Sequence, residues 1–251
     1  KICFKRAFVL ATIGYGTHAL LDAATSYGTL LLWPFSNHRI AWSVISVVDP
    51  VFTLGVLIFT LFSFVKADRK FSRWSLIFIF SYLSLGVFQK MRVQNHVEKT
   101  ANERGHIPSR TLIKPTVGNL ILWKSVYEDN GYYYSDAHRV GLFSAHYLFS
   151  GDKIKKLRLK KRFPDLDTNS ILYRDIQRFS HFSDGYIVIH PQYPDVIADL
   201  RYTLLPHRLD FLWGIEVHPR FPDRHADYHH FSSYSRDKKR QFFDMLWNSS
   251  N

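Results

Sequence analysis

Cysteine is nearly absent from this sequence, since Cys3 is the only one among 251 residues. A single cysteine excludes a disulfide framework and a CxxC zinc ribbon, so any metal site must use histidine, aspartate and glutamate. GxSxG, Walker A, GxGxxG and HExxH motifs are also missing, which leaves serine hydrolases, P-loop enzymes, Rossmann enzymes and typical zincins without support. Charged residues make up only 22% and aromatic residues reach 16%, which excludes a disordered tail.

Acidic residues are scarce in the first part of the chain. Residues 1–93 contain ten basic and three acidic residues, whereas residues 94–251 contain 23 and 18. The run from Pro50 to Val65 has no charge, and neither does the run from Trp74 to Phe88. Helices over Ala41–Val65 and Arg73–Gln89 would be roughly 37 and 25 Å long, against a hydrocarbon core of roughly 30 Å. Both can span a membrane, the second only narrowly.

The stretch Ala7–Trp33 is a third apolar segment, although it contains polar residues. The basic residues before it are also typical of a signal peptide, and a buried helix of a soluble protein would show a similar pattern. A signal peptide should not continue into a His and an Asp within further apolar sequence, so we expect a membrane helix. A signal peptide should also begin with Met, whereas this sequence begins with Lys, so we expect that further chain precedes it. The prediction is about three membrane helices.

Basic residues between the apolar runs Pro50–Val65 and Trp74–Phe88 indicate the topology. Cytoplasmic loops collect Lys and Arg, so the loop with Lys66, Arg69, Lys70 and Arg73 is predicted to be cytoplasmic. One further crossing places the residues after Lys90 outside the cytoplasm. Lys90 and Arg92, at the other end of the last helix, count against this orientation.

From Gln94 onward the sequence changes to short apolar clusters separated by turn residues. Asp129–Gly131 has the D-N-G pattern of a hairpin turn, and the clusters around residues 186–190, 196–205 and 212–217 are strand-like. Residues 98–106 resemble the end of a helix, and residues 236–247 resemble an amphipathic helix. We therefore predict an α+β protein, with membrane helices over residues 1–93 and an antiparallel β-rich extramembrane domain over residues 94–251.

The strongest candidate site is His18 with Asp22 in the apolar segment Ala7–Trp33. Four residues apart on a helix, they project from one face, with Thr25 on the next turn. An ionisable residue in a membrane helix costs roughly 2.5 to 3.5 kcal/mol at the bilayer centre, so it is normally kept for a partner or a task. A divalent metal ion, zinc or a similar ion, would explain both residues. A hydrogen bond that ties helices together is the alternative.

Asp49 is the third candidate, because no basic residue lies within nine positions of it. An unpaired aspartate there would be protonated or very costly. Since Pro50 disfavours helical geometry at Asp49, this residue could also cap a helix that starts at Val51. The Pro-broken segment between these elements suits an interfacial turn with Trp33 and Phe35 at headgroup depth. His38 is a further candidate ligand, with a solvated loop as the alternative.

Three weaker patterns lie in the second part. His218, His225, His229 and His230 could bind a transition metal, with His225 and His229 on one helix face, or could belong to a solvated loop. Asp199 and Arg201 are predicted to form a structural ion pair, with substrate contact as a minor alternative. Seven Lys or Arg residues between Gly151 and Phe163 could contact anionic headgroups or nucleic acid, or form a solvated surface. None of these patterns points firmly to a nucleic-acid partner.

The segment THALLDAATSYGTLLLWPFSNHRIAWSVISVVDPVFT carries a family resemblance. It resembles the second signature block of the inner-membrane metal-dependent hydrolase family, also called the LexA-binding, YdjM-like membrane hydrolases. Residues 114–127, 182–188 and 198–206 are similar to the C-terminal extension of one branch of that family. Members also carry an earlier HRGxTHS block, which this sequence lacks. We therefore expect either an N-terminally truncated fragment or a degenerate member of the family.

The resemblance implies that His18 and Asp22 are metal ligands and that Asp49 is a third ligand or a neighbouring group. It further implies metal-assisted hydrolysis, in which the ion activates a water and Asp49 accepts its proton. A membrane location favours contact with membrane lipid and a lipid-like or cell-envelope substrate. The alternative is a non-catalytic membrane module, in which the helices anchor a domain that binds a partner.

Overall fold

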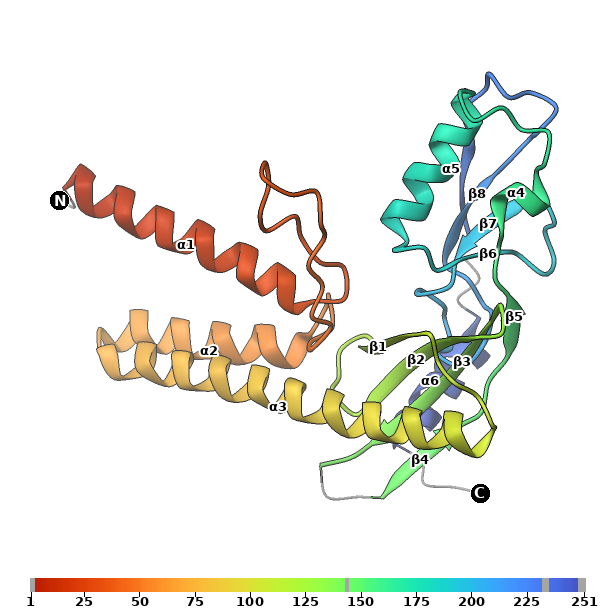
Figure 1. The fold of residues 1–251 in the computed structure, drawn as a ribbon. Coiled ribbons are helices and arrows are strands. Elements are labelled where there is room, and N and C mark those ends of the chain that lie inside the picture. Colours follow the sequence, from red (N-terminus) through yellow and green to blue (C-terminus); the bar gives the residue numbers. More distant parts are fainter. Residues whose placement is uncertain (1–2, 143–144, 232–234, 248–251) are drawn as a thin grey trace. The chain divides into compact units, whose positions relative to one another are not determined.

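The computed structural model describes residues 3–142, 145–231 and 235–247 (Figure 1). Two compact units divide the chain. Unit 1 comprises residues 1–99, 113–123 and 140–146, and unit 2 comprises residues 100–112, 124–139 and 147–251. Each is described by itself below.

Three helices dominate the first part of the chain: α1 (Phe4–Ala24), α2 (Pro50–Lys66) and α3 (Arg69–Glu103). Each differs from the predicted segment. α1 stops at Ala24 rather than Trp33, and a loop with bridges between Thr25 and Ile45 and between Thr29 and Ile40 follows it. The predicted helix from Ala41 was wrong at its start, because residues 41–49 form an irregular, non-helical segment with a positive φ of 50° at Ser43.

α3 is much longer than the predicted Arg73–Gln89, with 35 residues. Its second half has a buried stripe at every fourth position, formed by Gln89, Val93, Val97 and Ala101. Residues on such a stripe lie on one face of a helix, so packing continues the helix beyond the apolar run. Gln89 donates hydrogen bonds to the carbonyls of Leu120 and Val140, at 3.1 and 2.7 Å.

α2 and α3 lie side by side and are joined by aromatic contacts (Figure 1). The ring of Phe78 on α3 lies where a Cβ on Gly55 would stand, so the glycine admits the ring against the backbone of α2. The hydroxyls of Ser63 and Ser72 are 2.7 Å apart near the turn between the helices. The basic residues of this turn thus lie at one end of a helical hairpin.

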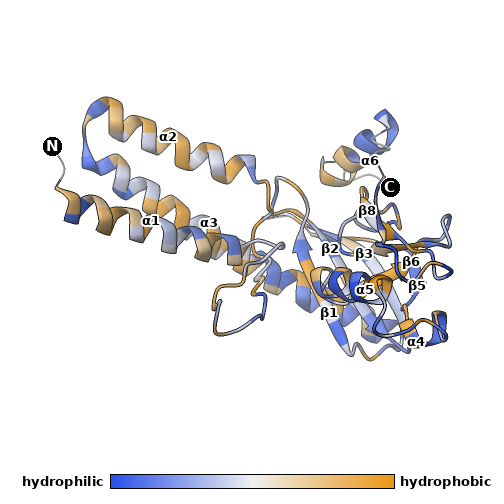
Figure 2. Ribbon diagram, turned by 90° about the horizontal axis from the view of Figure 1, so that it is seen from above, coloured by the Kyte–Doolittle hydropathy of each residue, from blue (hydrophilic) through white to orange (hydrophobic). Residues whose placement is uncertain are grey.

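Two described helices are long and apolar enough to cross a membrane, namely α1 and α3. Only 11% of the apolar window of each is buried, unlike the core helix of a soluble protein. α2 is apolar but has 17 residues. The structure therefore supports two spans by length and composition, and the predicted third is not confirmed. Figure 2, a ribbon coloured by hydropathy, shows mostly hydrophobic residues along α2.

The first sheet has the order β1-β2-β3-β4, with β5 paired to β3. Its strands are β1 (Arg110–Pro115), β2 (Leu122–Asp129), β3 (Tyr132–Val140), β4 (His146–Phe149) and β5 (Lys153–Lys155). The predicted hairpin is confirmed between β2 and β3. Asn130 and Gly131 both have positive φ, 49° and 77°, as a two-residue type I′ turn requires.

The second sheet is antiparallel, with the order β6-β7-β8-β9. Its strands are β6 (Ile187–Ile189), β7 (Val196–Asp199), β8 (Trp213–Glu216) and β9 (Asp227–His230). α5 (Ile171–Phe182) packs on one face, where Ile176 meets Ile187 and Ile197. Val188 and Ala198, on the alternate face, join a second core cluster with Tyr133 and Tyr186. Both faces are therefore buried, as the near-continuous apolar runs of these strands require.

Two short helices complete the chain, α4 (Leu159–Arg162) and α6 (Arg236–Trp247). α6 confirms the predicted C-terminal helix. The α+β class and the β-rich character of the second part are also confirmed.

Candidate functional site

His18 and Asp22 lie on one face of α1, and their side chains meet. The distance from His18 Nε2 to Asp22 Oδ2 is 3.4 Å. Two ligand atoms about 2.0–2.2 Å from one ion in a tetrahedral arrangement are themselves about 3.4 Å apart. The pair thus fits two positions of a metal site, and it is too widely spaced for a strong hydrogen bond. The side chains are 69% and 48% exposed, so their outer side is open to a further group.

Thr25, predicted on the same face, lies at the C-terminal end of α1. Its hydroxyl donates a hydrogen bond to the carbonyl of Asp22 at 2.8 Å, and its N–H donates to the same carbonyl at 3.0 Å. Thr25 therefore ends the helix directly beyond the His18–Asp22 pair. It stabilises the backbone that presents Asp22.

Asp49 caps α2, which confirms the capping alternative. Its Oδ1 accepts a hydrogen bond from the N–H of Phe52 at 3.0 Å, and its Oδ2 accepts one from the hydroxyl of Tyr82 at 2.8 Å. The residue is buried, and Pro50 occupies the first helical position, where no N–H donor is needed. One carboxylate oxygen thus caps α2, and the other joins the start of α2 to α3.

The three predicted ligands do not form one group. Within the described part of the chain, no three or more His, Cys, Asp and Glu side chains are placed to hold a metal ion. The structure brings together His18 and Asp22 and gives Asp49 a capping role elsewhere. The assignment of all three as ligands, and of Asp49 as proton acceptor, stays a prediction.

The capping role predicts a difference between two variants of Asp49. Asp49→Asn should leave the stability of the full chain in detergent micelles nearly unchanged, because the amide oxygen caps the helix as well as a carboxylate does and the amide N–H can donate to the Tyr82 hydroxyl. Asp49→Ala should lower the free energy of unfolding by about 1 to 2 kcal/mol, because the Phe52 N–H and the Tyr82 hydroxyl both lose their acceptor. Thermal unfolding measures both effects. Equal destabilisation by the two variants would contradict capping by Asp49.

The predicted interfacial turn exposes its aromatic side chains. Trp33 is 67% and Phe35 95% exposed, as expected of residues that meet a headgroup region. His38 lies in the loop that follows and is exposed, with its N–H donating to Ser36 Oγ. No ligand role for His38 follows from this position.

In unit 2, the predicted ion pair is confirmed. Arg201 donates to both carboxylate oxygens of Asp199, with a distance of 2.8 Å from Nη2 to Oδ2. Both side chains are buried, and a second donation from Arg201 reaches the carbonyl of Phe182 at 2.7 Å. The pair joins the end of β7 to the end of α5, which is a structural position.

The histidines of the tail do not share a helix face, so that alternative was wrong. His229 and His230 belong to strand β9, and His225 precedes it. His225 Nδ1 lies 2.7 Å from Asp175 on α5, whereas His229 lies 3.7 Å from Glu216 on β8. His218 Nε2 lies 3.6 Å from the other oxygen of Glu216. His229 and His230 are neighbours in a strand and therefore point to opposite faces of the sheet.

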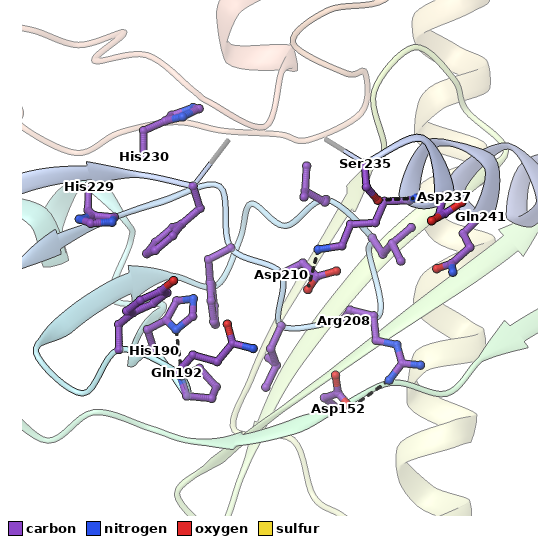
Figure 3. A pocket seen from close by; sticks show the side chains of 18 residues that line it. Asp152, His190, Gln192, Arg208, Asp210, His229, His230, Ser235, Asp237 and Gln241 are labelled. Carbon is purple, nitrogen blue, oxygen red and sulfur yellow. Dashed lines mark hydrogen bonds and ion pairs between the residues drawn. The ribbon is translucent and has the colours of Figure 1, made fainter. Parts of the chain in front are cut away.

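A pocket of about 890 Å³ lies in unit 2 beside β9 and α6 (Figure 3). At one end the rings of His190, Tyr193, His229 and Phe231 pack together, with centroids 4.7 Å apart for His190 and Phe231. His190 Nδ1 accepts a hydrogen bond from the N–H of Gln192 at 3.1 Å. Burial and the neighbouring His229 lower the pKa of His190, in accord with its acceptor role.

Ion pairs line the other end of this pocket. Asp210 Oδ1 lies 3.3 Å from Lys238 Nζ, and Asp152 Oδ1 lies 3.8 Å from Arg208 Nη1 (Figure 3). A ligand with an apolar ring and a polar group could contact both ends. The pocket combines residues that are far apart in the sequence, so no local motif revealed it.

Lys124 on β2 is a buried cation that the sequence pattern did not reveal. Its Nζ donates to Ser135 Oγ, Thr203 Oγ1 and the carbonyl of Pro206, at 2.9, 3.0 and 2.8 Å. Burial lowers the pKa of Lys124 to about 7, although the charges of Asp199, Asp136 and Asp152 oppose this shift. Only 2% of the residue is exposed, so its amine is not accessible to a substrate.

A family model supports the membrane assignment. The model described as YdjM inner membrane protein matches residues 3–93, which contain the His18–Asp22 pair, Asp49 and most of the apolar helices. No curated protein and no solved structure matches the chain. The family description and the two apolar helices both indicate association with the inner membrane. The recognition from the sequence is therefore confirmed for its first part: residues 3–93 match the YdjM inner membrane protein family.

Proposed function

We propose that this chain is a multi-pass, membrane-bound metal-dependent hydrolase, with a site for zinc or a similar divalent ion built on His18 and Asp22. The supporting observation is the 3.4 Å spacing of His18 Nε2 and Asp22 Oδ2 on an apolar, unburied helix. A histidine and an aspartate in such a helix need a partner when lipid surrounds them. A divalent cation satisfies both groups at this spacing.

The residues of the chain have distinct roles in this proposal. His18 offers a neutral nitrogen, and Asp22 offers a carboxylate that offsets part of the charge of the ion. A divalent ion supplies Lewis-acid chemistry, which polarises a carbonyl or phosphoryl group and makes water more acidic. Thr25 holds the last turn of α1, and hence Asp22, in place. We expect a lipid-like or cell-envelope substrate, because such molecules reach a site within a membrane.

The basic turn between α2 and α3 supports a topology for this proposal. Lys66, Arg69, Lys70 and Arg73 lie at one end of the helical hairpin, as residues of a cytoplasmic loop do. Lys90 and Arg92, at the other end, are engaged within unit 1. Lys90 Nζ donates to the carbonyl of Trp42 at 2.7 Å, and Arg92 donates to that of Gly141 at 2.9 Å. We propose that the residues beyond α3 are on the non-cytoplasmic side.

Metal content tests the proposal. The full chain, purified in detergent and dialysed against trace zinc, should contain stoichiometric metal by elemental analysis. His18→Ala and Asp22→Asn should each lose most of it, because two ligands of one ion act as a unit. His38→Ala and Asp68→Asn are matched controls, since they remove an exposed histidine and an aspartate elsewhere in unit 1. Metal-free parent protein, or unchanged metal in both variants, would contradict the site.

A non-catalytic membrane module is the second candidate. Two observations favour it: the structural hydrogen bonds of both Asp49 oxygens, and the pocket of about 890 Å³ in unit 2. In that case unit 2 binds a ligand or partner and the helices serve as its anchor. A parent protein without metal would favour this module over the hydrolase.

A further inference from the structure

A basic groove lies in unit 2. Its lining residues are distant in sequence from His18 and Asp22. It has a volume of about 520 Å³ and is lined by parts of the β2–β3 turn, of β5 and of α4. Five of its lining residues are cationic, and none is acidic. These cations are Lys155, Lys156, Arg158, Lys161 and Arg162.

The local fold explains why these cations converge. β5 pairs with β3 so that Lys155 lies opposite Tyr132, directly beside the turn at Gly131. The N–H of Lys156 then donates to the carbonyl of Gly131 at 3.0 Å, which holds the following residues against the turn. α4 begins after Arg158, and the backbone N–H groups of Lys161 and Arg162 donate hydrogen bonds to the carbonyl of Arg158. A short stretch of chain thus wraps its basic residues around one hairpin turn.

Few of these positive charges are neutralised within the protein. Lys156 Nζ pairs with Glu128, at 2.7 and 2.8 Å from its two oxygens, and Arg162 donates to the carbonyl of Pro194 at 3.2 Å. No ion pair in the described part of the chain involves Lys155, Arg158 or Lys161. Like charges held together repel one another, so an anion that enters the groove is stabilised.

The groove also has an apolar side, which narrows the ligand class. Ile154, Leu157 and Ile189 line it together with the ring of Tyr132. A Lys or Arg cluster beside aliphatic side chains suits a phosphate ester whose organic part contacts the apolar wall. Guanidinium groups bind phosphate oxygens in pairs, and ammonium groups add point charges. A solvated surface of scattered lysines would not form such a lined concavity.

We propose that this groove binds the phosphate group of an anionic ligand, either the headgroup of an anionic phospholipid or a soluble phosphate ester. Lys155, Arg158 and Lys161 provide the principal contacts, because they line the groove and have no acidic partner in the described part of the chain. The apolar wall receives the organic part of the ligand. This inference is independent of the proposed metal site.

The test uses the full chain in non-ionic detergent and two probes. One is phosphatidylglycerol added to the micelles, with phosphatidylcholine as the neutral comparison, and its binding is counted by native mass spectrometry. The other is inorganic pyrophosphate, followed by protection from an amine-reactive label of Lys155, which lines the groove and is kept in every variant. We expect at least one probe to bind, and the double variant Arg158→Gln, Lys161→Gln to weaken its binding by at least about tenfold, because two charge-assisted contacts are lost.

A second double variant provides a matched control. Lys160→Gln with Arg174→Gln removes the same charge from exposed positions of unit 2 that do not line the groove, and should change binding less than about twofold. Binding of phosphatidylglycerol alone identifies lipid as the source of the phosphate, and binding of pyrophosphate shows that a soluble ester suffices. Failure of both probes, or equal weakening by the two double variants, would overturn the proposal. A DNA oligonucleotide serves as a third probe. If it binds and the other two do not, and the double variant Arg158→Gln, Lys161→Gln abolishes its binding, the proposal is also overturned.

Discussion

Replacing Asp199 by alanine is expected to lower the free energy of unfolding of unit 2 by about 3 to 5 kcal/mol, because the variant leaves Arg201 charged, buried and unpaired. Arg201 donates to both oxygens of Asp199, and the N–H of Arg201 also donates to Oδ1 at 3.0 Å. Neither side chain has access to enough water to replace these bonds. Urea unfolding of the full chain in micelles, followed by hydrogen exchange of the β7 segment, measures the loss.

A double variant separates the pair from the packing around it. Asp199→Leu with Arg201→Met removes both charges and should recover most of the stability, because well-packed apolar residues often replace a buried ion pair at little cost. The coupling energy between the two positions should therefore be large. If the losses of free energy of unfolding from the Asp199 variant and from Arg201→Met simply added up in the double variant, the two charges would not act as a pair.

The second large effect concerns the pH dependence of stability through Lys124. Burial lowers the pKa of this amine to about 7, from 10.5 in a solvated lysine. Between these values the unfolded chain binds a proton that the folded chain does not, so the free energy of unfolding rises with pH. From pH 7 to pH 9 this contribution should amount to about 2 kcal/mol. Below pH 7 both states carry the charge, and the full cost of burying the ammonium opposes folding.

Comparison with Lys124→Met isolates this contribution from other titrating groups. Urea midpoints of both proteins are measured at several pH values between 6 and 10, and the parent should gain stability relative to the variant as the pH rises. Lys155→Met removes an exposed lysine and should keep the pH dependence of the parent. A parent and a Lys124→Met variant with parallel pH profiles would show that the pKa of Lys124 is close to its ordinary value.

Local patterns predicted several elements correctly. The Asn130–Gly131 turn follows from two residues that tolerate positive φ between strand-like runs, and Asp49–Pro50 is a typical helix start. The stripe at Gln89, Val93, Val97 and Ala101 was also present in the sequence. The membrane segment was predicted to end at Gln89, where the apolar run ends, whereas the helix end predicted within residues 98–106 is confirmed by the end of α3 at Glu103. The start of the membrane segment at Ala41 was wrong because hydropathy does not distinguish an irregular apolar segment from a helix, whereas the alternative start after Asp49 is confirmed.

The candidate sites show where such patterns become insufficient. His18 and Asp22 are four residues apart on one helix, so their meeting follows from helical geometry alone. Asp49 meets Tyr82, 33 positions away, and this contact depends on the packing of α2 against α3. The basic run from Lys155 to Arg162 was visible, yet its shape as a lined groove depends on the pairing of β5 with β3.

Composition and short-range spacing thus established an α+β chain with apolar helices near its N-terminus, a His–Asp pair on one of them and a basic, β-rich second part. These features depend on residues close together in the chain, whose geometry is set by the helix and strand repeats. The folded chain assigned the role of Asp49, the burial of Lys124 and Arg201, and the pocket and groove of unit 2. Each of these depends on contacts between residues that are distant in sequence, because desolvation and hydrogen bonding are set by the neighbours that folding brings together.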